Sequence, residues 1–175
     1  MGYIALACRW LTGIVFLAAA VSKTRSFDGF RRSVAAMAPP LAGRSTTVAG
    51  AVVGAELFVA ALIAAPGTAA WGLIAALVLD AVFIAAIVSA LRRGVQEPCR
   101  CFGATERGLG AREVVRDLIL GACAALGLFG VSAASPARSP AGWLLAAVAG
   151  AVGALLVVLF DDLVELFFPG QPGQV

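Results

Sequence analysis

The sequence predicts an all-α protein, a bundle of about four to five transmembrane helices with a short interfacial helix after the first span. Hydrophobic residues make up 61% of the chain and charged residues only 13%, whereas soluble domains average about half apolar and about a quarter charged. The mean hydropathy is +0.97. The apolar residues gather in stretches of about 20, the length that a helix needs to cross a lipid bilayer. We therefore expect lipid to surround much of this protein.

The apolar stretches predict five spans in a single transmembrane domain over residues 1–175. The first span is interrupted only by Arg9, and a Pro66-Gly67-Thr68 turn joins the second span to the third. A secretory signal peptide is the alternative for the first stretch, but its basic residues follow the apolar run instead of preceding it. The expected spans are 3–21, 48–65, 69–91, 113–134 and 142–165, and residues 169–175 are expected to form a disordered tail.

Between the first two spans, residues 22–47 alternate basic and apolar side chains at helical spacing. Phe27, Phe30, Val34 and Met37 would share one side of a helix and the arginines the other. This pattern predicts a helix in the membrane interface, with its apolar side in lipid and its end at Pro39-Pro40. A solvated basic loop is the alternative.

Small residues four positions apart occur in three of the predicted spans, and such pairs let membrane helices approach closely. A composition rich in alanine and glycine also produces them by chance, so they support only a compact bundle. The pairs are Gly50 and Gly54, Gly121 and Ala125, and the series Ala146, Gly150 and Ala154.

Basic residues lie mostly on one side of the predicted membrane protein. Residues 22–47 and 92–112 hold five Lys or Arg residues each, whereas the turns on the other side hold only Arg138. Because basic loops stay in the cytoplasm, we expect a multi-pass protein of the cell membrane with its amino terminus outside. The carboxy terminus and the loop around Cys99 and Cys101 would then be cytoplasmic.

Several functions are excluded by composition. The chain has no histidine, so an imidazole base, histidine-ligated haem or zinc and a serine–histidine triad are all ruled out. A net charge of +3 is too small in so apolar a chain to indicate nucleic acid as a partner. We expect neither a cofactor nor a bound metal.

Chemistry is most strongly indicated by Cys99 and Cys101, two thiols one residue apart in the polar segment before the fourth span. A disulfide between them would close a small, strained ring that is easily reduced. About three net positive charges in residues 92–112 and the start of a helix favour the thiolate form. The supporting loop residues are Pro98, Arg100, Phe102 and Gly103.

Other interpretations of this thiol pair stay open. Copper(I) or zinc could bind two thiolates, but a closed site needs further ligands. A structural disulfide or an idle pair of thiols is the other alternative. Cys8 and Cys123, each inside a predicted span, are most simply small buried apolar residues, and the sharper hypothesis makes one of them an accessory, resolving thiol.

Three ionisable residues fall inside predicted spans: Arg9, Glu56 and Asp80. Charged groups in the membrane are costly and usually pair with each other or serve a function. An ion pair between Arg9 and Glu56 would offset two burials, and we favour it. The functional alternative makes Glu56 or Asp80 a proton relay.

Taken together, these features resemble the MauE-like and DoxX-like redox-associated membrane proteins, named from methylamine utilisation. The resemblance covers roughly residues 10–135, and its most specific element is the Cys-x-Cys-Phe-Gly sequence. The weaker elements are Ser22-Lys23 followed by Phe27 and Phe30, Pro39-Pro40, Glu56-Leu57, and Arg116-Asp117 at the start of the fourth span.

The resemblance implies a protein that works with a thioredoxin-like partner to form, reduce or isomerise disulfides of exported proteins, as proposed for methylamine dehydrogenase maturation. Cys99 and Cys101 would be its dithiol, and an exported disulfide-rich protein its client. The charge-derived orientation puts this dithiol inside, whereas such maturation occurs outside, so the direction of electron flow stays open. The alternative function is a non-redox assembly subunit, or a small carrier whose cavity is lined by Arg9, Glu56 and Asp80.

Overall fold

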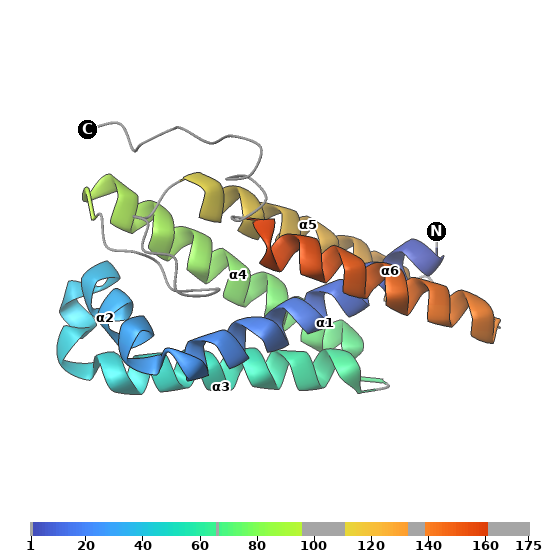
Figure 1. Ribbon diagram of the computed structural model, residues 1–175, viewed down its shortest axis with the longest axis horizontal. Coiled ribbons are helices and arrows are strands. Elements are labelled where there is room, and N and C mark those ends of the chain that lie inside the picture. The colour runs from blue at the N-terminus through green and yellow to red at the C-terminus, as the bar shows by residue number, and fades with distance from the viewer. Residues whose placement is uncertain (1, 66, 96–110, 133–138, 161–175) are drawn as a thin grey trace.

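The computed structural model describes residues 2–65, 67–95, 111–132 and 139–160. Within these ranges every regular element is helical, which confirms the predicted all-α class (Figure 1). The elements are α1 (Gly2–Arg25), α2 (Phe27–Met37), the 3₁₀ helix η1 (Pro39–Arg44), α3 (Ser45–Ala64), α4 (Ala69–Arg92), α5 (Ala111–Ser132) and α6 (Pro140–Val158).

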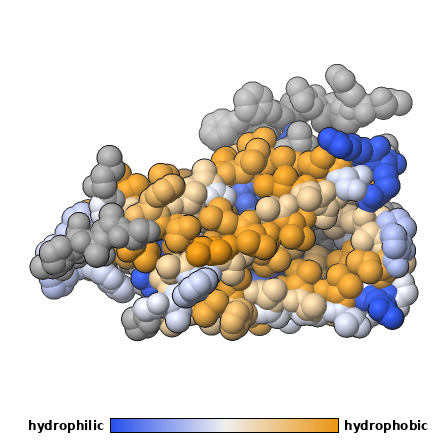
Figure 2. Space-filling view, turned by 180° about the vertical axis from the view of Figure 1, so that it is seen from behind, coloured by the Kyte–Doolittle hydropathy of each residue, from blue (hydrophilic) through white to orange (hydrophobic). Residues whose placement is uncertain are grey.

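Five helical segments are long and apolar enough to cross a membrane: Gly2–Arg25, Pro39–Ala64, Ala69–Arg92, Arg112–Val131 and Pro140–Val158. Their outer surface is apolar, and Figure 2 shows a broad hydrophobic face with hydrophilic residues toward the ends. Phe129 is 75% exposed and Leu145 72% exposed. Because contiguous apolar surface of this extent is unstable in water, lipid must cover it. The protein is therefore a multi-pass membrane protein, as predicted.

Helix α1 lies at the centre of the bundle (Figure 1). It packs against α3, α5 and α6, while α4 closes the ring by contacting both α3 and α5. Val15 and Phe16 of α1 form the middle of the core with Ile63 of α3, Leu73 of α4 and Leu120 of α5. Helix α6 lies along α1 on the outside of this four-helix ring.

The short helix α2 corrects part of the expectation for residues 22–47. A helix does follow the first span and ends at Met37, just before Pro39-Pro40. Its apolar side does not face lipid, however, because Phe30 and Val34 are buried against Ala49 of α3. The apolar periodicity was right, but the surface that it covers is protein.

The first span is also longer than expected, since α1 continues past Val21 to Arg25. Lys23, counted above among the loop charges, therefore lies inside a helix and is 1% exposed. Both the aliphatic stem and the charge of Lys23 face the bundle. Hydropathy does not reveal this, because a lysine ends an apolar stretch of sequence whether its side chain is buried or exposed.

Helix α4 ends in a Schellman motif. Gly94 has a φ of +70°, a conformation that favours glycine. Its N–H donates to Leu91 O over 3.0 Å, and Val95 N–H donates to Ala90 O over 3.1 Å. The Arg93 guanidinium also donates to Met37 O, which ties this end of α4 to α2. The segment 96–110, including Cys99 and Cys101, lies outside the described residues.

The three small-residue series have different roles. Ala146, Gly150 and Ala154 are all buried, and a Cβ on Gly150 would lie 2.6 Å from Ala7 O, so this series is the contact of α6 with α1. Gly50 and Gly54 are exposed, and a Cβ on either would meet nothing within 4 Å of the described residues. The second-span pair is therefore not a helix contact in the described bundle.

We predict that Gly150→Ala destabilises the protein by about 1–3 kcal/mol, because the new methyl group must push backbone atoms of α1 away. Gly50→Ala is the matched control and should be neutral or stabilising by up to about 1 kcal/mol, since alanine favours helix where there is space. Thermal unfolding of the purified variants in one detergent checks this. Equal effects of the two substitutions would contradict the α1–α6 contact.

Candidate functional site

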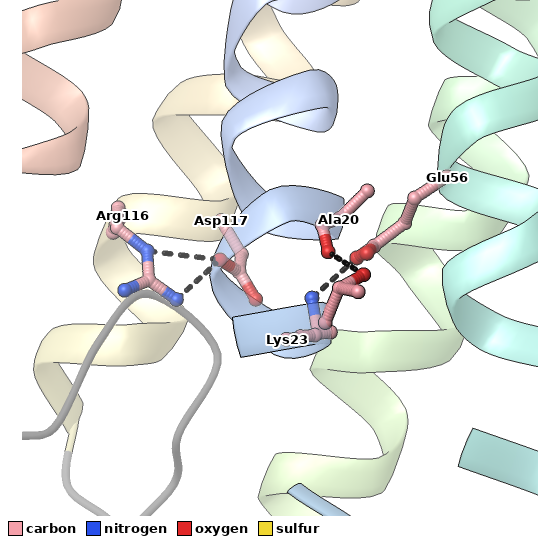
Figure 3. A network of polar contacts seen from close by, with 6 residues as sticks. Ala20, Lys23, Glu56, Arg116 and Asp117 are labelled. Carbon is pink, nitrogen blue, oxygen red and sulfur yellow. Dashed lines mark hydrogen bonds and ion pairs between the residues drawn. The ribbon is translucent and has the colours of Figure 1, made fainter. Parts of the chain in front are cut away.

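A cluster of five charged side chains lies inside the bundle, toward the end at which α4 ends and α5 begins. Figure 3 shows four of them: Lys23, Glu56, Arg116 and Asp117. Each helix of the four-helix ring contributes to it. Each of the five residues is at most 5% exposed. They are Lys23 of α1, Glu56 of α3, Asp80 of α4, and Arg116 and Asp117 of α5.

The centre of the cluster is an ion pair between Lys23 and Glu56. The Lys23 Nζ donates to Glu56 Oε1, and both residues are 1% exposed. The same ammonium lies over two aromatic rings, 5.4 Å from the ring centre of Phe30 and 5.2 Å from that of Phe83. These rings exclude solvent and attract the cation through their π-electron faces.

Helix α5 supplies the second pair of charges. The Arg116 guanidinium donates to Asp117 Oδ1 from Nη2 over 3.2 Å and from Nε over 3.3 Å. Asp80 of α4 is close enough to both residues to interact with them electrostatically. Its carboxylate reaches α5 where Gly121 has no side chain, because a Cβ there would lie 2.7 Å from Asp80 Oδ2. Gly121 therefore admits the Asp80 carboxylate into the cluster.

These side chains surround a small cavity of about 20 Å³, which the apolar residues Val15, Phe16, Ala19, Phe83 and Leu120 complete. That volume suits one water molecule and is too small for an organic solute. Glu56 Oε2 is buried without a hydrogen-bond partner among the described residues. The arrangement thus provides charged groups around a water-sized space, which suits charge stabilisation or proton exchange and not solute binding.

Arg9 lies at the opposite end of the bundle and has another role. Its guanidinium donates to the carbonyl oxygen of Ile63 from Nη2 over 2.6 Å and from Nε over 3.0 Å. It also approaches Ala64 O at 3.4 Å. A cation at the carboxyl end of a helix satisfies free carbonyls and the helix dipole, so Arg9 stabilises the end of α3.

The expected ion pair between Arg9 and Glu56 is therefore wrong. Glu56 of α3 pairs with Lys23, which lies near the carboxyl end of α1. Arg9, near the amino end of α1, binds carbonyl groups at the end of α3 instead. The expectation failed because main-chain carbonyls at a helix end are strong acceptors for Arg9, and because Lys23 lies within α1. The cavity brings Glu56 and Asp80 together, as the carrier hypothesis requires, but Arg9 does not line it.

Cys8 and Cys123, which the sequence placed singly in two spans, meet in the structure. Both are free and half-buried, and the two thiols are near enough to interact electrostatically. In the antiparallel helices α1 and α5, the start of one lies beside the end of the other. The predicted site residues Pro98, Cys99, Arg100, Cys101, Phe102 and Gly103 lie outside the described residues.

Sequence reasoning missed Lys23, Arg116 and Asp117 as site residues. Lys23 follows Phe16 and Ala19 at intervals of seven and four residues, so helical periodicity places it on the same buried side of α1. Arg116 and Asp117 lie five and six residues into α5. The helical spacing of these residues is visible in the sequence. It was overlooked because Lys23 was counted in the loop after the first span, and Arg116 and Asp117 were placed at the start of the fourth span.

We predict that Lys23→Met destabilises the protein by about 3–5 kcal/mol, because it leaves the Glu56 carboxylate buried without its cation. The double variant Lys23→Met/Glu56→Leu should lose much less, since neither charge remains. Arg25→Met, at an exposed position two residues further along α1, is the control and should have little effect. Chemical unfolding in detergent measures all three, and a double variant as unstable as Lys23→Met would contradict the pairing.

Comparison with known proteins gives one family match. Residues 1–130 match the family described as methylamine utilisation protein MauE. The match covers α1, α3, α4, α5 as far as Gly130 and every residue of the charged cluster, and it ends before α6.

A search of curated proteins finds no match, and neither does a search of solved structures. The family match nevertheless extends over well more than half of the 175 residues. With five membrane-crossing helices and the matched region containing the buried cluster, the chain belongs to the MauE family of methylamine utilisation membrane proteins.

Proposed function

We propose that this protein passes electrons between its Cys99–Cys101 pair and a thioredoxin-like partner, in support of disulfide formation or maturation of exported proteins. The observation that carries the proposal is the Cys-x-Cys pair itself, in the polar segment that joins α4 to α5. Family membership supports a role in the maturation of an exported enzyme of methylamine metabolism.

The exchange proceeds by two thiolate attacks. One thiolate of the pair attacks a sulfur of the partner's disulfide, forms a mixed disulfide and releases one partner thiolate. The second cysteine then attacks the mixed disulfide, which closes the Cys99–Cys101 disulfide and releases the other partner thiolate. Two electrons have passed to the partner, whose two thiolates take up the two protons. The reverse sequence oxidises the partner.

The buried cluster suits this chemistry as a support for the segment. The segment 96–110 follows α4 in the chain and precedes α5. The charged cluster links these two helices inside the membrane. Arg92 and Arg93 are exposed at the end of α4, and positive charge favours a thiolate. The carrier alternative receives less support, because the cavity between the helices holds about 20 Å³.

We place the segment in the cytoplasm. Lys23 is buried and no longer counts as a loop charge. Arg25, Arg31, Arg32 and Arg44 are still exposed on this side, so the excess of positive charge persists. A cytoplasmic dithiol suits a protein that receives electrons from cytoplasmic thioredoxin and passes them onward.

We predict that Cys101→Ser traps a mixed disulfide through Cys99, or that Cys99→Ser traps one through Cys101, because the resolving thiol is missing. The measurement is non-reducing electrophoresis with mass spectrometry of membranes mixed with a thioredoxin variant that has a single active-site cysteine. Cys8→Ser is the control and should trap nothing. If both single variants form no adduct while Glu56→Gln abolishes function, the carrier hypothesis replaces this one.

We also predict that a membrane-impermeant maleimide does not label Cys99 or Cys101 in intact cells, and labels them after permeabilisation and reduction. The pair should be recovered partly oxidised. Labelling from outside would reverse the orientation and favour an oxidase or isomerase helper. Thiols that stay reduced and label freely in every condition would contradict the redox function.

A further inference from the structure

Cys8 and Cys123 form a second thiol pair that the proposed function does not use. The thiols are near enough across the α1–α5 interface to interact electrostatically, and both are free and half-buried. Cys8 lies about 9 Å along α1 from its first residue, and Cys123 about 14 Å along α5 from its last. The pair is therefore within the membrane, in the half opposite the charged cluster.

The helix faces that carry the two thiols are the faces that touch. Ala5 precedes Cys8 by three residues, and Gly127 and Gly130 follow Cys123 by four and seven, so each set shares one side of its helix. A Cβ on Gly130 would lie 1.9 Å from Ala5 Cβ, and one on Gly127 would lie 3.4 Å from Arg9 N. The two helices are thus closely packed next to Cys8 and one turn from Cys123, and a disulfide requires such close helices.

The surroundings of the pair determine which oxidant can reach it. Ile4, four residues before Cys8, is 61% exposed, and the neighbours of Cys123 on α5, Ile119 and Leu126, are 43% and 53% exposed. Because this surface faces lipid, a charged oxidant in water has little access. A two-electron acceptor that dissolves in the bilayer has access from the side.

We propose that Cys8 and Cys123 are a reversible intramembrane dithiol site that a lipid-soluble quinone oxidises. In this step two S–H bonds break and one S–S bond forms between the Sγ atoms. The two electrons and two protons released reduce the quinone to its hydroquinone. The proposal does not depend on Cys99 or Cys101, and it gives the chain thiol chemistry in both halves of the membrane.

The test uses the full chain in lipid nanodiscs with Cys99→Ser and Cys101→Ser, so that only the intramembrane pair can react. The probe is a short-tailed benzoquinone with a fully substituted ring, to which thiols cannot add. We expect one hydroquinone per chain by ultraviolet absorbance and a Cys8–Cys123 crosslinked peptide by mass spectrometry. Adding Cys8→Ser or Cys123→Ser should abolish both signals and leave one alkylatable thiol.

Two outcomes would overturn the proposal. If both cysteines can still be fully alkylated after quinone treatment, the pair has no redox role and only packs the helices together. A disulfide that forms as fast with a charged, water-soluble aromatic disulfide as with the quinone would show that water reaches the thiols. If the serine substitutions at residues 99 and 101 prevent folding, peptide mapping of the unaltered chain gives the same crosslink readout.

Discussion

The buried ion pair of Lys23 and Glu56 is the interaction on which the rest of this bundle depends. Both charges are withdrawn from water inside apolar surroundings, where an unpaired charge is very costly. The pair therefore fixes the position of α1 against α3. Arg9 repeats the constraint at the other end by binding the last carbonyls of α3. Because these two contacts lie about 21 Å apart along α1, they determine both the register and the direction of the two helices.

Close packing completes what the polar contacts begin. Lipid gives membrane helices no hydrophobic reason to associate, so they associate where small residues permit backbone contact. Gly150 allows α6 to lie against α1, Gly130 allows α5 to approach it, and Gly121 makes room for the Asp80 carboxylate. Helix α1 consequently packs against α3, α5 and α6 on its different sides. Charged groups collect in one half of the membrane and the paired thiols Cys8 and Cys123 in the other.

In this chain without histidine, which belongs to the MauE family, the charged residues and the intramembrane thiols are thus separated. The charged cluster holds together α1, α3, α4 and α5, and the cavity within it admits little more than one water molecule. A thiol pair within the membrane would give the same bundle a place to exchange electrons with lipid-soluble carriers.

The sequence by itself determined the membrane class, the presence of helices long and apolar enough to span a bilayer and the short helix before Pro39-Pro40, because hydropathy and proline act locally. It also singled out Glu56 and Asp80 as costly intramembrane groups. Only the tertiary structure decided which groups meet. Glu56 pairs with Lys23, Arg9 binds the carbonyl groups at the end of α3, and Phe30 packs against protein and not against lipid. The tertiary structure likewise brought Cys8 beside Cys123. Partner choice depends on which helices become neighbours and how each is rotated, and residues far apart in the chain acquire that relation only when the bundle packs.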